Sequence, residues 1–397
     1  MKTKFAFIIA LLFSVLKLAA QIPEKAIPFI FDNHLYIQGF VMDTIPLSLC
    51  FDTGAYRLYV DKYYMDMSSF GKLPLRMGKV EFAGTGNSRA KTYKKINNTI
   101  PLKMGNVTYK LRKTPILNLR EMGGRHMDAI IGCNSVFDKP LLLNYLDGYL
   151  LPLDSLTPSI LEGYTKLPAR FKPNGIEIEC DLKIDSIQHV KGKFLLDTGC
   201  SGAIVLTNAA RKRLDLKGKR QAKYNISNVG AGGDGTDIVF RAESFSLLGE
   251  LNNVVVSASY NTKGGLSNRS YLGLIGNDIL CHYDWIIDAP HKTLYVRRNS
   301  NKDNSYQISS KQHMAYIDRT DITDGWIVKG IIEGGIAQLA GFEIGDIIIS
   351  INGRQVKEIS WEEQRHGLGL NGRTTYEVRK KGGEIVTYIL NIDKEII

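Results

Sequence analysis

Two stretches of this sequence, Phe51-Asp52-Thr53-Gly54-Ala55 and Leu196-Asp197-Thr198-Gly199-Cys200, share the order apolar residue, aspartate, threonine, glycine. Each stretch ends a short apolar run that is typical of a buried strand. A carboxylate at the end of a buried strand is costly to desolvate, and the glycine lets main-chain N–H groups approach and compensate it. One copy alone would indicate only a turn. Two copies in matched surroundings indicate a site.

The surroundings of the two copies repeat as well. An apolar-apolar-glycine run follows each aspartate at a distance of about 80 residues, and a glycine-rich tip lies between the aspartate and that run. The corresponding segments are Ala129-Ile130-Ile131-Gly132 with Leu274-Ile275-Gly276, and Gly84-Thr85-Gly86 with Gly230-Ala231-Gly232. The exit segments 143–147 and 285–288 also correspond. A period of roughly 140 residues is too long for a solenoid repeat and indicates a duplicated domain.

This order of motifs resembles the aspartic proteases of pepsin and retroviral type, over roughly residues 27–298. The resemblance implies a mainly β fold of two duplicated barrel-like lobes, with Asp52 and Asp197 as the catalytic pair that shares one water across a pseudo-twofold axis. It also implies residues that support the two turns, namely Thr53, Gly54, Thr198, Gly199, Gly132 and Gly276. The glycine-rich tips, Gly84, Thr85, Gly86, Gly230, Ala231 and Gly232, would then be flaps over the substrate. Ordinary loop tips are the alternative for either one alone.

The expected chemistry needs no metal or cofactor. Peptide hydrolysis by water requires a base to activate the water and an acid to protonate the leaving nitrogen. Two adjacent carboxylates supply both, because they do not readily ionise together and so hold one proton as a pair. The seven His residues are scattered without metal-ligand spacing, and no Ser or Cys lies in a recognisable nucleophile motif.

The sequence departs from the pepsin pattern after each glycine, where Ala55 and Cys200 replace the usual hydroxyl residue. A hydroxyl at that place can donate to the carboxylate and lower its pKa. Alanine has no donor and a thiol is a weak one, so we expect a mildly acidic pH optimum. The alternative to an enzyme is an inactive protein that binds peptides in the same cleft. Both Asp-Thr-Gly motifs are intact, which favours the enzyme.

The C-terminal part of the chain has a different composition. The run from Gly334 to Gly353, with a predicted short helix at 336–340 and an Asn352-Gly353 hairpin, resembles a bacterial PDZ domain attached to periplasmic proteases, and the whole chain resembles a bacterial aspartyl protease of this kind. The resemblance implies a small α+β unit with a peptide groove at Gly325, Trp326, Ile327 and Val328. The alternative is a unit that only packs against the protease.

We therefore expect a signal peptide at 1–20, a first lobe at 21–158, a second lobe at 159–299, a polar linker at 300–311 and a PDZ domain at 312–397. The polar linker predicts few contacts between the PDZ domain and the lobes. A helix is predicted at 207–214. Because one chain carries both aspartates, a monomer should suffice for catalysis.

The N-terminal segment has a basic start, a short apolar run and a small-residue cleavage site, which predicts export to a bacterial periplasm or medium. We expect peptide or protein partners and no integral membrane span. The net charge of +11 comes with no nucleic-acid recognition motif. The five Cys residues have irregular spacing, which leaves one disulfide and free thiols equally open.

Overall fold

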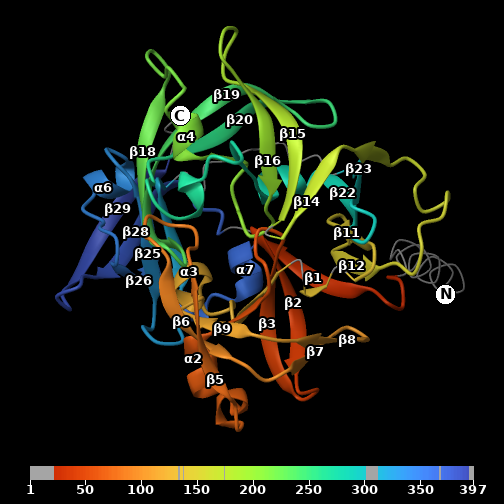
Figure 1. The fold of residues 1–397 in the computed structure, drawn as a ribbon. Helices are drawn as coiled ribbons and strands as arrows, with labels where there is room; N and C mark the ends of the chain where they lie inside the picture. Colours follow the sequence, from red (N-terminus) through yellow and green to blue (C-terminus); the bar gives the residue numbers. More distant parts are fainter. Residues whose placement is uncertain are drawn as a thin grey trace, which may run out of the picture.

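The computed structural model describes residues 22–132, 135–136, 138–173, 175–300, 312–365 and 368–392. The predicted signal peptide and nearly all of the predicted linker lie outside these residues. The described chain is mainly β, as predicted, with short helices at the ends of strands (Figure 1). In Figure 1 the first half, coloured red to orange, lies below the second half, coloured yellow to green.

The strands of the first half carry the first aspartate at the end of a central strand. They are β1 (Ile27–Asp32), β2 (His34–Val41), β3 (Ile45–Asp52), β4 (Leu58–Asp61), β5 (Met77–Phe82), β6 (Lys91–Ile96), β7 (Ile100–Met104), β8 (Val107–Leu111), β9 (Thr114–Leu117), β10 (Ala129–Gly132), β11 (Leu141–Asn144) and β12 (Tyr149–Pro152). Their hydrogen-bonded order includes β2-β3-β10-β4-β9-β6-β5.

The strands of the second half repeat this arrangement. They are β13 (Thr165–Leu167), β14 (Ala169–Lys172), β15 (Gly175–Lys183), β16 (His189–Leu196), β17 (Ile204–Leu206), β18 (Gln221–Gly230), β19 (Gly233–Ser246), β20 (Glu250–Ser259), β21 (Gly273–Ile275), β22 (Tyr283–Asp288) and β23 (Thr293–Arg298). The order β15-β16-β21-β17-β20-β19-β18 matches that of the first half strand for strand. Both halves also place one parallel pair beside the aspartate strand, β3 with β10 and β16 with β21. The predicted duplication is therefore confirmed by topology.

A shared sheet joins the two halves. Its strand order is β13-β23-β22-β11-β12-β1, so that three strands of the second half lie beside three strands of the first half in one hydrogen-bonded layer. The two repeated exit segments meet at its centre, where Leu142 of β11 pairs with Ile286 of β22. The lobes are thus held together along their whole base, which fixes the positions of the aspartate loops above it.

Alternation along β3 decides which side chains reach the core and which reach the cleft. Leu47, Leu49 and Phe51 are buried on one face, as successive side chains of a strand point to opposite sides. Cys50 and Asp52 lie on the other face, and Tyr36 of β2 lies directly across from Cys50. Asp52, Cys50 and Tyr36 therefore share one face of the sheet, opposite the face packed into the core.

The helices are short and lie at strand ends. They are α2 (Lys62–Met67), α3 (Arg120–Gly123), α4 (Asn208–Arg211), α5 (Asn277–Leu280), α6 (Ile336–Leu339) and α7 (Trp361–Arg365), with 3₁₀ turns at Ser69–Lys72, Gly265–Ser267 and Val356–Glu358. The predicted helix at 207–214 is shorter than expected: Thr207 caps α4, and the chain then tightens into bonds from Arg213 N and Leu214 N to carbonyls three residues back. Within the described ranges, no helix is long and apolar enough to cross a membrane.

The C-terminal unit, residues 312–392 as described, has a core of its own. Its strands are β24 (Met314–Asp318), β25 (Trp326–Ile332), β26 (Ile347–Ile351), β27 (Arg354–Gln355), β28 (Gly372–Arg379) and β29 (Ile385–Ile392). The predicted hairpin is present between β26 and β27, where Asn352 and Gly353 have φ of 49° and 80°. Positive φ at both positions is the requirement of a type I′ turn.

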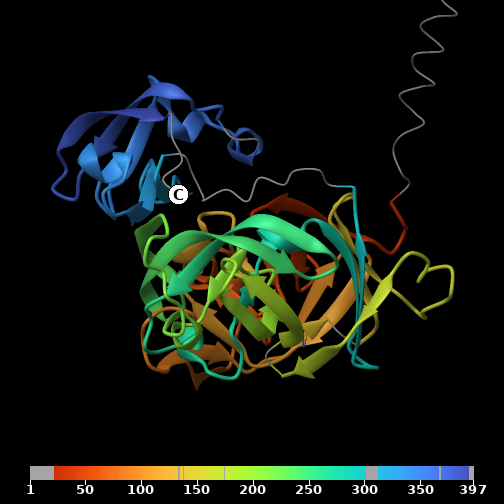
Figure 2. The same ribbon diagram turned by 90° about the horizontal axis from the view of Figure 1, so that it is seen from above.

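The expectation of few contacts between this unit and the lobes is wrong. Strand β18 of the second lobe pairs with β25, so one sheet runs from the lobe into the C-terminal unit. Arg120 of the first lobe bonds Asp321 at 3.0 Å, and Arg125 bonds Asp318 at 2.9 Å. Figure 2 shows the unit on one side of the joined lobes, beside β18. A polar linker predicts a flexible connection, but it carries no information about the surfaces on either side.

Candidate active site

The two Asp-Thr-Gly loops form one compact centre. Gly54 N–H donates to Asp52 Oδ1 at 2.8 Å, and Gly199 N–H donates to Asp197 Oδ1 at 2.9 Å. Each glycine also packs against the aspartate of the other loop. A Cβ added at Gly54 would lie 2.6 Å from Asp197 Oδ1, and one at Gly199 would lie 2.5 Å from Asp52 Oδ2. Glycine is required at both positions because each carboxylate occupies the space of the missing side chain.

The two threonines lock the loops together beneath the carboxylates. Thr53 N–H donates to Thr198 Oγ1 and Thr198 N–H donates to Thr53 Oγ1, both at 3.0 Å. Each hydroxyl in turn donates to a main-chain carbonyl of the opposite lobe, Thr53 to Leu196 O and Thr198 to Phe51 O, both at 2.8 Å. Both threonines are buried. The network is symmetric and fully paired, so it holds the two loops at a fixed separation.

The two later glycines lie beside the aspartate turns, where the resemblance places them. Gly132 pairs in parallel with Asp52, and a Cβ there would meet the backbone of Ala55 and Arg57. Gly276 follows β21, whose Ile275 O accepts from Asp197 N at 3.0 Å. Side chains at these glycines would push the loops apart.

Burial raises the pKa of both Asp52 and Asp197, and the charge of Asp52 raises the pKa of Asp197 further. The main-chain N–H donors oppose the effect of burial at each carboxylate by favouring its charged form. Two neighbouring carboxylates of raised pKa do not readily ionise together, so such a pair favours a state with one shared proton. The pair can therefore accept a proton from water and donate one to a leaving group.

Three residues that the sequence analysis missed support the centre from below. His34 Nε2 lies 3.1 Å from Gly199 O, and burial lowers the pKa of this histidine to about 4, so the ring is neutral near pH 6. Asn277 Nδ2 donates to Thr198 O at 2.7 Å, and Tyr145 Oη donates to Asn277 Oδ1 at 2.6 Å. Only the place of Asn277 directly after Gly276 offered a sequence signal for any of them.

The glycine-rich tips of the two halves contact each other. Gly232 N–H donates to Thr85 O at 2.5 Å, and a Cβ at Gly84 would lie 2.5 Å from Ala231 Cβ. A Cβ at Gly230 would lie 2.7 Å from Thr85 Cβ. The two hairpins that were predicted as flaps, β5–β6 and β18–β19, are thus interlocked at their ends.

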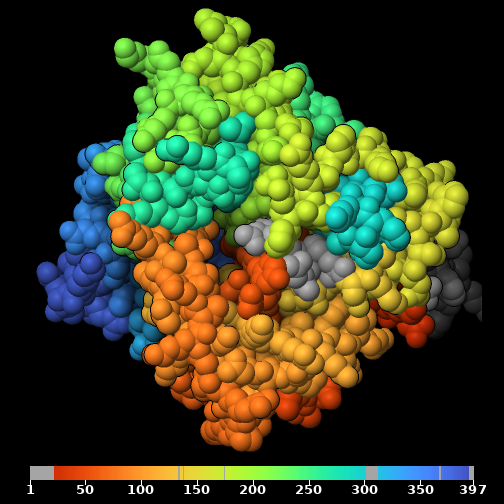
Figure 3. All heavy atoms as spheres, in the orientation of Figure 1, coloured from red at the N-terminus to blue at the C-terminus, as the bar shows by residue number. Residues whose placement is uncertain are grey.

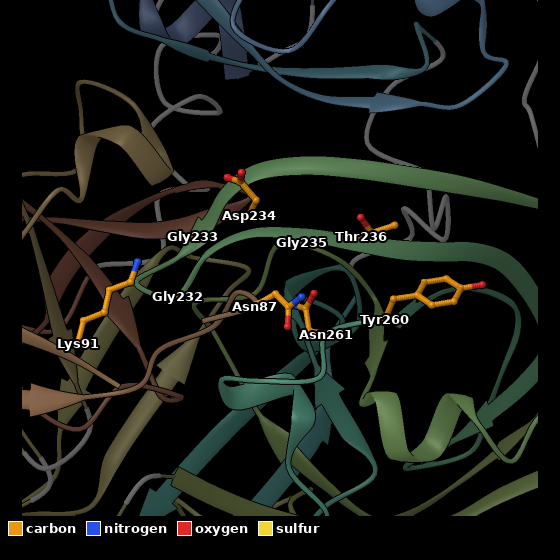
Figure 4. Close-up of a pocket in the computed structure, with 9 residues that line it drawn as sticks. All are labelled: Asn87, Lys91, Gly232, Gly233, Asp234, Gly235, Thr236, Tyr260 and Asn261. Carbon is orange, nitrogen blue, oxygen red and sulfur yellow. The ribbon is translucent and has the colours of Figure 1, made fainter. Parts of the chain in front are cut away.

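An open hollow of about 530 Å³ adjoins both flap tips. Figure 4 shows the residues that line it, Asn87, Lys91, Gly232, Gly233, Asp234, Gly235, Thr236, Tyr260 and Asn261. Its lining is mostly polar and includes neither aspartate of the pair. It therefore adjoins the interlocked hairpin tips, and neither Asp52 nor Asp197 lines it.

The predicted groove in the C-terminal unit needs correction. Trp326 and Ile327 pair with β24 on one side and with β26 on the other, so this part of β25 has no free edge for an added peptide strand. Val328 is buried, and its N–H donates to Asp346 O. Gly325 packs beneath Ile347 and Ile348. Gly325, Trp326 and Val328 are buried in the unit, and Ile327 is partly buried.

No group of three or more His, Cys, Asp or Glu side chains among the described residues is arranged to hold a metal ion. Cys50, Cys180, Cys200 and Cys281 form no disulfide among the described residues, and Cys133 lies outside them. Burial raises the pKa of the Cys200 thiol, and the nearby charge of Asp197 raises it further. This thiol stays protonated beside the pair.

Comparison with known proteins places a PDZ domain in the C-terminal unit, where residues 327–363 match that family. Among solved structures, the chain is similar to the aspartic proteinase from Irpex lacteus. That similarity has 13% sequence identity and a TM-score of 0.45, and covers 71% of this chain and 99% of that chain. No curated protein matches the sequence.

Proposed function

We propose that this chain is an aspartic endopeptidase, of the bacterial aspartyl protease kind that its sequence resembles. A water activated between Asp52 and Asp197 would attack the peptide bond. The observation that carries the proposal is the reciprocal packing of each glycine on the opposite aspartate, which holds two carboxylates of raised pKa close together. A purely structural pair of buried carboxylates would gain nothing from such closeness, because like charges destabilise each other.

The remaining parts of the site fit the steps of this reaction. The carboxylate without the shared proton takes a proton from water, and the protonated one donates to the amide nitrogen as the bond breaks. The threonine network keeps the carboxylates in position through both steps. The interlocked flap tips would hold an extended peptide against the floor and exclude bulk water. The PDZ domain would recruit or orient peptide or protein substrates. We also propose export of the chain to the periplasm or medium, on the strength of the N-terminal sequence.

The test is cleavage of a peptide library by the purified full chain at mildly acidic pH. Asp52→Asn and Asp197→Asn should each lower kcat/KM by roughly 10³-fold or more and leave the melting temperature nearly unchanged, because both carboxylates act as one unit. Asp154→Asn, at an exposed aspartate far from the pair, is the matched control.

A metal chelator should have no effect on cleavage. Near-wild-type activity in either dyad variant contradicts the assignment, and so does inhibition by the chelator. A protein that binds library peptides but never cleaves them would instead be the inactive peptide-binding protein.

A further inference from the structure

An apolar surface continues from Asp52 along the cleft floor of the first lobe. Tyr36 and Ile130 both pair with Cys50, and Tyr59 pairs with Ile130, so these side chains share the sheet face that carries Asp52. Tyr59, Ile130, Phe82, Tyr93, Ala231 and Trp361 are partly buried and pack around Tyr36 and Cys50 in one cluster. We call this cluster the lobe 1 pocket surface. Partly exposed apolar side chains beside a carboxylate pair are suited to contact a substrate side chain.

The members of this surface come from three parts of the molecule. Phe82 and Tyr93 belong to the first flap and stack with ring centroids 4.7 Å apart. The Tyr93 hydroxyl donates to the carbonyl of Ala231 at the tip of the second flap, at 2.7 Å. Trp361 is the contribution of the PDZ domain, from helix α7. Figure 3 shows a hollow between the orange first flap and the red strands, with blue atoms of the C-terminal unit at its far side.

Trp361 is held firmly in this position. Its Nε1 donates to Asp32 Oδ2 at 2.7 Å. Its ring stacks on His126 with centroids 4.2 Å apart, and packs edge-on against Tyr36 at 5.2 Å. Three contacts of the first lobe fix the ring, from β1, from β2 and from the segment between α3 and β10, and Trp361 stays partly exposed. Tyr36 pairs with Cys50, which lies two residues before Asp52. A residue that served only to anchor the PDZ domain would not need to contact a side chain so near the aspartate.

The corresponding surface of the second lobe is closed without help from the PDZ domain. Leu195 and Leu274 lie there at the positions of Cys50 and Ile130, and they cluster with Leu266, Val205 and Tyr271. All of these residues belong to the second lobe. The surfaces beside Asp52 and Asp197 therefore differ in a way that the duplication does not explain. The surface beside Asp52 includes a tryptophan from outside the lobes, and the surface beside Asp197 does not.

We propose that Trp361 is a specificity-determining residue of the cleft: it forms one wall of the lobe 1 pocket surface and selects a large apolar side chain on one side of the bound peptide bond. This inference rests on the proposed function for the identity of the ligand as a peptide. The physical basis is the apolar area that a large side chain buries against the indole ring, which a small side chain cannot match. The PDZ domain is then part of the substrate site.

The experiment measures binding and cleavage with two peptide series. One series varies the residue before the central peptide bond and the other varies the residue after it, each through Phe, Leu, Val and Ala. In the binding experiments the central amide is replaced by a reduced (CH₂–NH) bond, so that it cannot be hydrolysed. Affinities are measured by calorimetry with the full-length Asp197→Asn protein, and kcat/KM is measured with the wild-type chain and normal peptides. The preference is the ratio of the values for the Phe and Ala peptides, in affinity or in kcat/KM. When Trp361→Ala is added to each protein, this ratio should fall at least tenfold in one series and stay within twofold in the other.

Trp361→Phe should restore most of the preference, because it replaces the wall by a smaller aromatic ring. Equal weakening across all side chains in both series would show a purely anchoring role and overturn the proposal, as would an unchanged preference. Should the alanine variant lose its folded C-terminal unit, Trp361→Leu and Trp361→Phe give the same comparison. The wild type could also bind Phe peptides more tightly than Ala peptides in a way that depends on Trp361, and yet cleave none of them. That result would overturn the proposed endopeptidase and support this inference.

Discussion

The titration of the aspartate pair depends on a few donors whose identity is visible residue by residue. The N–H groups of Gly54 and Ala55 favour the charged form of Asp52, while burial raises the pKa of the carboxyl and has the larger effect. Ala55 lacks a side-chain donor. The basic limb of the pH–rate profile reports loss of the shared proton, so it should lie at higher pH than in an enzyme with a hydroxyl at this place.

Ala55→Ser is predicted to add that donor. A hydroxyl hydrogen bond stabilises the ionised carboxylate, lowers the pKa of the pair and moves the basic limb of kcat/KM to lower pH by about 0.5 to 1 unit. Ala55→Cys is the matched control, because a thiol has similar size and donates weakly. A basic limb that stays in place in the serine variant would mean that burial and the flaps alone set the titration.

A second residue-scale prediction concerns Lys329, which reaches from the PDZ domain into both lobes. Its Nζ donates to Met122 O at 2.5 Å and to Asn228 O at 3.0 Å, and burial lowers its pKa to about 8. The unfolded lysine keeps its proton up to about pH 10. Between these values the unfolded state binds more protons than the folded state, so stability rises with pH.

Lys329→Met should remove this rise. Between pH 7 and 10 the free energy of unfolding of the wild type should increase by about 2 kcal/mol relative to the variant, measured by denaturant titration at each pH. Lys223→Met is the control, because Lys223 is exposed and its pairing with Glu333 raises its pKa. Parallel curves for wild type and Lys329→Met would refute the charge argument.

Among the elements, the flaps depend most directly on glycine. Gly86 has φ of 114°, and a Cβ there would collide with the backbone of Gly232 and Gly233 in the other flap. Gly86→Ala should therefore keep the tips apart and lower kcat/KM on peptides by about tenfold or more, since a closed site is needed to exclude water. Gly233→Ala is the control. Gly233 also has a positive φ, of 87°, so alanine there causes similar backbone strain, but the added Cβ meets no other atom within 4 Å. A difference between the two variants therefore reports the collision and not the strain. Equal activities in the two variants would contradict a role for tip contact.

The two flaps also differ in their supports. Strand β5 of the first flap ends its sheet, whereas β18 of the second flap continues into β25 of the PDZ domain. An outer strand with one free edge has fewer hydrogen bonds to break when it moves. We therefore expect the first flap to open and the second to serve as its fixed partner.

The sequence predicted the duplicated elements well, because each of them leaves a local mark. The Asp-Thr-Gly loops, the later glycines and the two tips are short patterns at matching offsets, and the structure brings their members together. The supports of the site have no such mark. His34 and Tyr145 are ordinary residues in apolar strands or turns, and their contacts depend on chain segments more than 130 residues away.

The groove in the PDZ domain was placed wrongly for a related reason. A run such as Trp326-Ile327-Val328 predicts a buried strand, but the pattern does not say whether the strand lies at an edge or inside a sheet. Here β24 and β26 take its two edges. The pairing of Tyr224, Asn225 and Ile226 with β25 was equally hidden, because main-chain bonds leave no trace in side-chain type.

At the scale of the whole molecule, the PDZ domain breaks the symmetry of the duplication. It extends the sheet that contains β18, and it contacts the first lobe through Trp361 and through ion pairs to Arg120 and Arg125. Both contacts lie close to the cleft. Under the proposed function we therefore expect the unit to influence the binding of short peptides as well as of large substrates.

Removal of residues 300–397 should consequently impair cleavage of short peptides as well as of large substrates. The truncated chain loses the strand that β18 pairs with and the indole that closes the lobe 1 pocket surface, while the joined core of the two lobes remains. We expect a folded protein with a lower melting temperature and a kcat/KM on hexapeptides reduced by about tenfold or more.

The matched control for this truncation is a full-length chain with Arg354→Ala, which removes an exposed ion pair to Glu363 within the PDZ domain. An exposed pair contributes little, so this variant should cleave hexapeptides like the wild type. A truncated protein with full hexapeptide activity would mean that the contacts of the PDZ domain with the cleft have no part in catalysis. Loss of activity together with unfolding of the lobes would instead assign the PDZ domain a role in the stability of the whole body, and circular dichroism separates these results.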